Sequence, residues 1–232
     1  MTQRRMRPAA RLAATALLLA LAGCGSLIPG GQREAPRVFA PDVQVRVDPS
    51  WPTVDWQLSV ATPSASESLT TSRIAVRPQP GELEVYAGAL WMDAAPELVQ
   101  NALVRAFEDS QRIMAVSRFG GGLRGDFALL LDLRRFESIY VDGHPQATIE
   151  LSAKLTHFRG NRVVAARTFH HAEPATGTAV PLVSEAFGRG LSTVVSDVVG
   201  WTLTEGERVA AALEAAETPA TRSEPLPLPR RD

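Results

Sequence analysis

The chain has 232 residues, with 24 Lys and Arg against 25 Asp and Glu, and 45% of its residues are hydrophobic. This balance of charge argues against a nucleic-acid-binding protein, which normally carries a basic face and a high isoelectric point. The length fits one well-filled domain with extensions, or at most two small domains. A single cysteine excludes an intramolecular disulfide and a Cys/His zinc cage.

The N-terminus has the pattern of a bacterial export signal. Four arginines between residues 4 and 11 precede a short apolar run, Leu12 to Leu21. At about 1.5 Å per residue, this run would span only half of a ~30 Å hydrocarbon core, so we expect a signal peptide and not a stable membrane span. The run ends Leu21-Ala22-Gly23-Cys24, which resembles the lipobox of bacterial lipoproteins.

The lipobox resemblance implies signal cleavage between Gly23 and Cys24 and a covalent lipid on the Cys24 thiol. A plain signal peptide with an incidental cysteine is the alternative, and it is disfavoured because the only cysteine of the chain falls at this position. Gly25 stands where an aspartate would be expected to retain a lipoprotein in the inner membrane. By that resemblance, the protein is sorted to the periplasmic face of the outer membrane, where more than one acyl chain gives stable anchoring.

Composition divides the remaining chain into three parts. Without residues 1–23 it carries 20 basic and 25 acidic groups, a formal net charge of −5, so charge alone would not hold it on an anionic membrane. Residues 24–42 are rich in Gly, Pro and polar side chains, and we expect a flexible tether after the acylated cysteine. Residues 43–205 form the predicted domain, and the Pro/Ala-rich tail 206–232 is expected to be disordered.

Hydrophobic periodicity predicts an α+β domain. Strands are expected at 43–47, 54–60, 73–77, 113–118, 127–133, 147–156 and 163–169, with a hairpin-like continuation at 82–86. A first helix should begin near Asp93, the expected N-cap, with Pro96 in its first turn, and a second should run from 180 to 203. The order β-β-β-α-β-β-β-β-α favours a single, mostly antiparallel sheet with two helices packed on one face.

Residues that could bind a metal or a phosphate group do not form a convincing site. The four histidines are His144, His157, His170 and His171. The last two are adjacent and would face opposite sides of a strand, so ordinary surface histidines are favoured over a metal site. The glycines between 120 and 125 lack the Lys-Ser/Thr pair and the following helix of a phosphate-binding loop, so no nucleotide site is expected.

The sequence also gives no reason to expect a catalytic residue. It contains no Gly-x-Ser-x-Gly motif, and acylation would leave no free thiol. Asp132 and Glu137 could form a carboxylate pair, but Arg134 and Arg135 lie between them, which favours a surface cluster of ion pairs. We therefore expect a protein that is not an enzyme and that needs no metal.

A short aromatic segment is the most informative part of the domain. Tyr86, Trp91 and Met92 lie just before the first predicted helix. Tyr and Trp are enriched at binding hot spots, so Tyr86 and Trp91 are candidate partner-binding residues. Core packing at the edge of the sheet is the alternative, and for Trp91 it is the favoured one.

The same region carries a family resemblance. Its features are Arg73 to Arg77, Leu83, Tyr86, Trp91, Asp93, Pro96, Leu98, Leu103, Phe107 and Ser110. This pattern resembles the ABC-type transport auxiliary lipoprotein family, whose members accompany mammalian-cell-entry (MCE) lipid transport systems. The resemblance covers about residues 43–203, nearly all of the predicted domain.

The resemblance implies a non-catalytic partner of an MCE-domain protein and its associated ABC permease and ATPase. The cargo of such a system would be phospholipid or a related hydrophobic molecule, and the chain itself would bind no nucleotide and no nucleic acid. Two alternatives stay open from the residues alone: a lipid-binding periplasmic carrier, and a structural lipoprotein that assists assembly of an outer-membrane complex.

Overall fold

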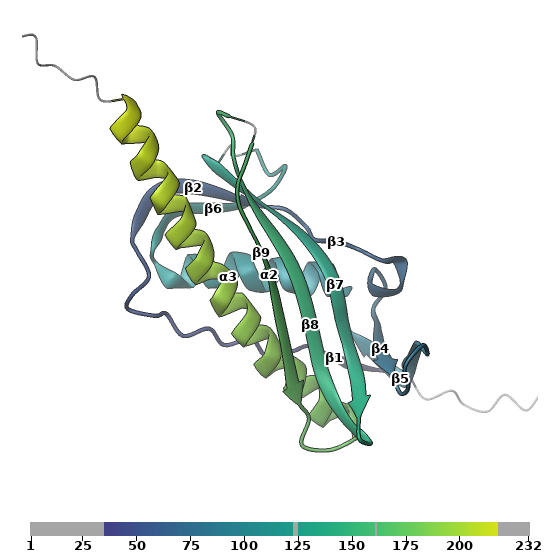
Figure 1. The fold of residues 1–232 in the computed structure, drawn as a ribbon. Helices are drawn as coiled ribbons and strands as arrows, with labels where there is room; N and C mark the ends of the chain where they lie inside the picture. The colour runs from purple at the N-terminus through teal and green to yellow at the C-terminus, as the bar shows by residue number, and fades with distance from the viewer. Residues whose placement is uncertain (1–34, 123–124, 161, 218–232) are drawn as a thin grey trace, which may run out of the picture. The chain divides into compact units, whose positions relative to one another are not determined.

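In the computed structural model, a mixed β-sheet and two long helices make up the described residues, 35–122, 125–160 and 162–217 (Figure 1). The strands are β1 (Arg37–Phe39), β2 (Val54–Val60), β3 (Ser64–Ala65), β4 (Arg73–Arg77), β5 (Glu84–Trp91), β6 (Ile113–Arg118), β7 (Phe127–Val141), β8 (His144–His157) and β9 (Arg162–Pro174). The helices are the short 3-10 turn η2 (Glu67–Leu69), α2 (Ala95–Ser110) and α3 (Val180–Glu217). The expected single-domain α+β class is confirmed.

Two kinds of strand pairing meet at β7. The long strands β7, β8 and β9 form continuous antiparallel ladders, as expected. The shorter strands β2, β3 and β4 pair in parallel with β7, and β6 pairs in parallel with β2. The sheet is therefore mixed, because the first half of the chain returns to β7 by crossovers and not only by hairpins.

The turn between β7 and β8 follows the prediction from its sequence. Asp142 and Gly143 both have positive φ, 50° and 78°. Positive φ at both central residues is the geometry of a two-residue hairpin turn that matches the twist of the flanking strands. This turn fixes the register in which β8 lies on β7.

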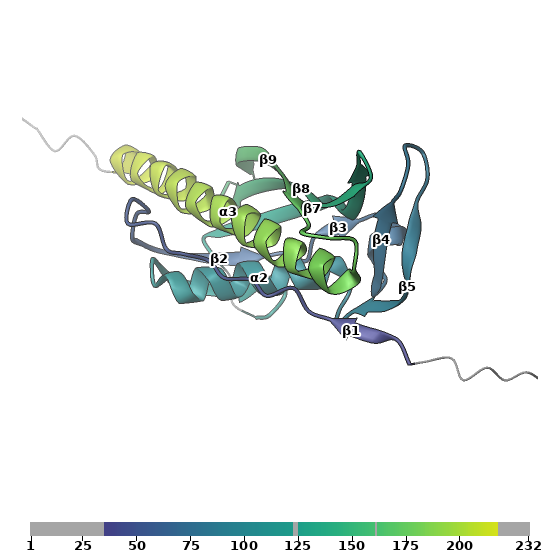
Figure 2. The same ribbon diagram turned by 90° about the horizontal axis from the view of Figure 1, so that it is seen from below.

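The core lies between the sheet and the two helices (Figure 2). On β8 the alternating residues Ala147, Ile149, Leu151, Ala153 and Leu155 are all fully buried. Helix α3 packs over β8 and β9, α2 packs on β6, and the helices also contact each other. Their buried faces are the apolar stripes that the 3.6-residue period predicted.

Helix α2 begins one residue later than expected. Its N-cap is Ala94, which makes no side-chain capping bond, so Asp93 is not the cap. The edge of the sheet extends further than the sequence indicated, since the Met92 N–H donates to the Phe39 carbonyl at 2.8 Å. The chain therefore turns into the helix only after Asp93, while Pro96 lies in the first turn as predicted.

The N-terminal part of the domain also differs from the prediction. Residues 43–47 form no strand. Val43 and Val45 still pack against the core, but the Gln44 N–H donates to Ser192 Oγ of α3 at 3.0 Å and not to a neighbouring strand. The strand is instead β1, which pairs in parallel with β5 and lies within the range expected to be a tether.

Helix α3 extends well beyond its predicted end at residue 203. It continues to Glu217, so the first part of the tail that was expected to be disordered is helical. The Ala- and Glu-rich composition of this stretch favours helix, and Val209 and Ala210 pack against the core. Residues 218–232 lie outside the described part of the chain.

Three glycines allow α3 to lie close to the rest of the domain. A Cβ at Gly188 would lie 2.7 Å from the Asp42 carbonyl oxygen, and one at Gly200 would lie 2.5 Å from Trp51 Nε1. A Cβ at Gly206 would overlap the ring of Trp56. These glycines therefore have a packing role, which outweighs their low helix propensity.

Candidate functional site

The predicted lipid-attachment residue Cys24 and the cleavage residue Gly23 lie outside the described residues. Within the described ranges, no helix is both long and apolar enough to cross a membrane.

The structure separates the two candidate partner-binding residues by their exposure. Trp91 is only 2% exposed and makes edge-to-face contacts with Phe136 and Phe187, at centroid distances of 5.8 and 5.1 Å. This arrangement fits the packing interpretation. Met92, the next residue, is 60% exposed.

Tyr86 is half-buried in the sheet. Its hydroxyl shares a hydrogen bond of 3.0 Å with Ser138 Oγ. Burial raises the pKa of Tyr86 to about 12, so the phenol is neutral near pH 7. The hydrogen bond links β5 to β7 across the intervening strand β4, and Tyr86 stays partly exposed.

Glu137, which precedes Ser138 on β7, forms a partly buried ion pair with Arg77 of β4. Glu137 is a buried residue, and its carboxylate accepts two hydrogen bonds from Arg77, from Nε at 3.2 Å and from Nη2 at 3.0 Å. Arg77 Nη1 also donates to the Glu82 carbonyl at 3.2 Å. The guanidinium thus joins β4 to β7 and to the turn that precedes β5.

The sequence interpretation placed Glu137 wrongly in a surface cluster. The parallel pairing of β4 with β7 places Arg77 opposite Ile139, next to Glu137, and such long-range pairing cannot be read from local spacing. Asp132 does lie at the surface, 3.1 Å from Arg134 Nε. The two carboxylates belong to separate ion pairs and not to one acid–base site.

The histidines are distributed over several places. His144 Nδ1 lies 2.9 Å from the Asp142 carbonyl oxygen in the hairpin turn, and His171 Nε2 lies 3.1 Å from Glu173. The Glu173 pKa is lowered chiefly by its hydrogen bond to Arg189. No group of three or more His, Cys, Asp or Glu side chains in the described ranges could hold a metal.

The glycine-rich segment connects two strands. Gly120 and Gly122 have φ values of 87° and 90°, which suit a tight loop. The chain then continues into β7 and not into a helix, so this part of the structure provides no helix N-terminus for a phosphate group.

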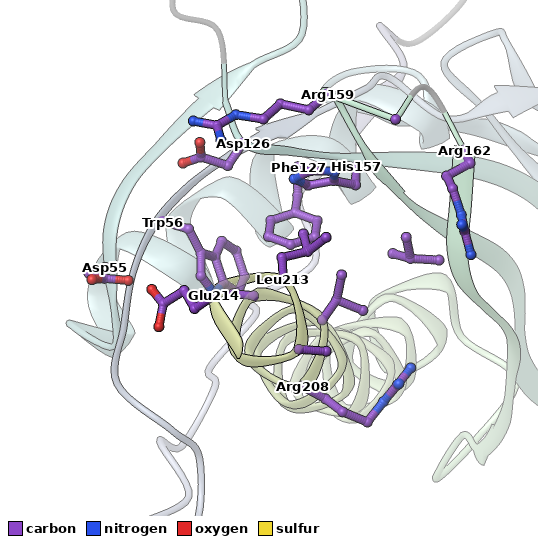
Figure 3. A pocket seen from close by; sticks show the side chains of 15 residues that line it. Asp55, Trp56, Asp126, Phe127, His157, Arg159, Arg162, Arg208, Leu213 and Glu214 are labelled. Carbon is purple, nitrogen blue, oxygen red and sulfur yellow. The ribbon is translucent and has the colours of Figure 1, made fainter. Parts of the chain in front are cut away.

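A groove lies between the C-terminal part of α3 and the ends of β8 and β9 (Figure 3). It encloses about 800 Å³. Trp56 and Phe127, whose rings meet edge to face with centroids 4.9 Å apart, lie at its base. Val164 of β9 and Leu213 of α3 line its sides.

Charged side chains surround the groove unevenly. Figure 3 shows Asp55, Asp126 and Glu214 toward one side, together with the guanidinium of Arg159 beside Asp126, and the guanidinium groups of Arg162 and Arg208 toward the other. Local sequence patterns do not indicate this groove. Its walls come from elements far apart in the chain, and the helical wall belongs to a segment that was expected to be disordered.

The folded part of the chain matches a known family. The family model described as "ABC-type transport auxiliary lipoprotein component" matches residues 38–199. The chain belongs to this family. Membership confirms the resemblance carried by residues 73–110.

Two solved structures and one sequence relative place this auxiliary lipoprotein among similar proteins. A crystal structure of a Xanthomonas campestris protein of the DUF330 family is 47% identical, covers 75% of this chain and 99% of its own, and superposes with a TM-score of 0.73. A second, uncharacterized protein, 14% identical, has a TM-score of 0.57 over 72% of this chain and 97% of its own, which shows a shared fold.

The sequence relative is an uncharacterized protein of Bradyrhizobium diazoefficiens. It is 29% identical over 183 residues, which is 79% of this chain and 49% of that protein. The auxiliary lipoprotein therefore spans about half the length of this curated relative.

Proposed function

We propose that this auxiliary lipoprotein is a non-catalytic, lipid-anchored subunit of an MCE-type ABC transport system. The MCE-domain protein of that system would carry phospholipid or related hydrophobic cargo between the inner and outer membranes. The family match over residues 38–199 carries this proposal, because it covers nearly the whole folded domain.

The proposed anchor is a lipid on Cys24, which would hold the domain at the periplasmic face of the outer membrane. The described chain begins next to β1, so the domain connects to the anchor through residues 25–34 and the edge of the sheet. No cofactor other than this covalent lipid is proposed.

Replacing the acylation residue tests the anchor. We expect Cys24→Ser to leave the outer-membrane fraction, either as a released protein or as an uncleaved precursor, because serine provides no thiol for the lipid. Gly25→Asp, which keeps the cysteine, should move the protein from the outer to the inner membrane fraction. Membrane fractionation and immunoblotting measure both. Detergent-dependent fractionation of Cys24→Ser identical to the wild type would contradict the anchor.

The proposed contact surface for the MCE-domain protein includes Tyr86 and the exposed residues Leu83 and Val85 that precede it on the same hairpin. Trp91 is not part of this surface, because it is buried. An apolar surface that stays exposed in a folded domain is typical of a protein-binding site.

Co-purification tests both the partner and this surface. A tagged wild-type chain, extracted from native membranes in mild detergent, should retain an MCE-domain protein identified by mass spectrometry. Leu83→Glu/Val85→Glu should reduce the retained partner at least tenfold, because it places charge in an apolar contact. Met114→Glu changes an exposed apolar residue on β6 and should retain the partner. Absence of any MCE-domain protein from the wild-type extract would contradict the proposed function.

A further inference from the structure

We infer that the groove beside α3 binds an acyl chain of an anionic lipid, directly and without the transport partners. This gives the auxiliary lipoprotein a ligand site of its own, separate from the surface around Tyr86. The inference goes beyond docking, since a subunit that only docks needs no lipid site.

The base and sides of the groove suit a hydrocarbon chain. Trp56 and Phe127 lie at the base, with Val164 and Leu213 at the sides. A volume of about 800 Å³ lies within the range of roughly 300–1,000 Å³ that small-molecule sites occupy. Leu213 is 39% exposed although it faces this apolar base. A bound chain would cover it and remove apolar surface from water.

The charges at one opening suit an anionic headgroup. The Arg162 side chain makes no hydrogen bond or ion pair with any residue that the structure describes, and it lies on the same side of the groove as Arg208 (Figure 3). Arg208 is held in place by Glu205, whose Oε2 accepts its Nη2 hydrogen bond at 2.7 Å. A phosphate or carboxylate between the two guanidinium groups would receive charge-assisted hydrogen bonds.

The acidic residues at the other side orient the ligand. Asp126 Oδ2 accepts a hydrogen bond from the Gln57 N–H at 2.9 Å, so this carboxylate is fixed by β2. Asp55 and Glu214 lie at the same end with one guanidinium, that of Arg159, so three carboxylates against one cation would still disfavour an anionic headgroup there. The headgroup therefore lies at the Arg162 and Arg208 opening, and the chain extends toward Trp56.

Photo-crosslinking in a bilayer tests this site. The full acylated chain would be reconstituted in nanodiscs that contain phosphatidylglycerol with a diazirine in one acyl chain. Parallel samples would contain the matching diazirine phosphatidylcholine or diazirine fatty acid. Adducts would be located by tandem mass spectrometry after irradiation. We expect adducts on peptides that contain Trp56 or Leu213, at least fivefold more with phosphatidylglycerol than with phosphatidylcholine. Labelling by the fatty acid alone would assign the site to carboxylate amphiphiles; labelling by phosphatidylglycerol would assign it to phospholipid.

Two variants separate the chain site from the headgroup site. Leu213→Arg should reduce adducts at the groove at least fivefold, and Arg162→Glu should abolish the preference for phosphatidylglycerol. Val141 is 45% exposed and lies at the opposite end of β7 from Phe127, so Val141→Arg is the control for Leu213→Arg. Arg105→Glu, on the exposed face of α2, is the control for the second. Thermal melting checks that all four variants are folded.

Three results would overturn the inference. The first is equal labelling in the variants and their controls, and the second is equal labelling by the anionic and the neutral phospholipid. The third is wild-type labelling confined to peptides away from the groove. The experiment contains no transport partner, so its failure would leave the co-purification result unaffected, and failure to retain an MCE-domain protein would leave the lipid site standing.

Discussion

Trp91→Ala should lower the free energy of unfolding by about 3–5 kcal/mol, the usual cost of removing a large aromatic side chain from a core. The indole is 2% exposed and packs between Phe136 of β7 and Phe187 of α3. Its removal would leave a cavity where the sheet meets the helix. Urea denaturation, followed by far-ultraviolet circular dichroism, measures the change.

The neighbouring residue provides a matched control for Trp91. Met92 is 60% exposed, and Met92→Ala should change the free energy of unfolding by less than about 0.5 kcal/mol. If Trp91→Ala were as stable as the wild type but failed to retain the transport partner, Trp91 would be a docking residue and its assignment to the core would be wrong.

Arg77→Met should destabilise the domain by about 3 kcal/mol, the lower end of the cost of breaking a buried ion pair. The lower end applies because the Arg77 side chain is partly exposed, at 31%, whereas that of Glu137 is 8% exposed. The variant would leave the carboxylate buried without its two hydrogen bonds. The loss is measured as a lower urea concentration at the midpoint of unfolding, with no change in the slope of unfolding free energy against urea concentration.

A double variant shows whether the cost comes from the carboxylate left behind. Arg77→Met/Glu137→Met replaces both partners by apolar side chains and should recover most of the stability lost by Arg77→Met. Arg134→Met, which removes an exposed ion pair with Asp132, should cost less than about 1 kcal/mol. Equal losses for Arg77→Met and Arg134→Met would show that the Arg77 pair behaves as a surface pair.

Local patterns in the sequence identified the elements whose partners are nearby. The alternation along β8 reports one buried and one polar face, and the dipeptide Asp142-Gly143 defines a turn whatever the rest of the chain does. The apolar stripe of α2 likewise needs only the 3.6-residue period. These features depend on neighbours within a few residues, so they could be predicted.

Two features depend on contacts between residues far apart in the chain, and local sequence patterns could not predict them. Nothing local to Arg77 indicates that its strand lies parallel to β7, so the ion pair with Glu137 could not be predicted. Helix α3 was expected to end near residue 203, because the period of its larger apolar residues fades there. Packing of Val209 and Ala210 continues the helix and thereby forms one wall of the groove.

The connection through β1 has a mechanical consequence. Tension on the proposed lipid anchor would first load the short β1–β5 pairing, which holds only three residue pairs. The segment that follows is held on α3 and the core, since Val43 and Val45 pack against the core and the Gln44 N–H donates to Ser192 Oγ. It ends at Trp51, a buried residue that packs against Gly200 of α3. Release of residues 37–50 would break these contacts and give a connecting segment with a contour length of about 46–50 Å, at roughly 3.3–3.6 Å per extended residue. The domain could thus extend its reach from the membrane while its core, and the groove within it, stayed folded.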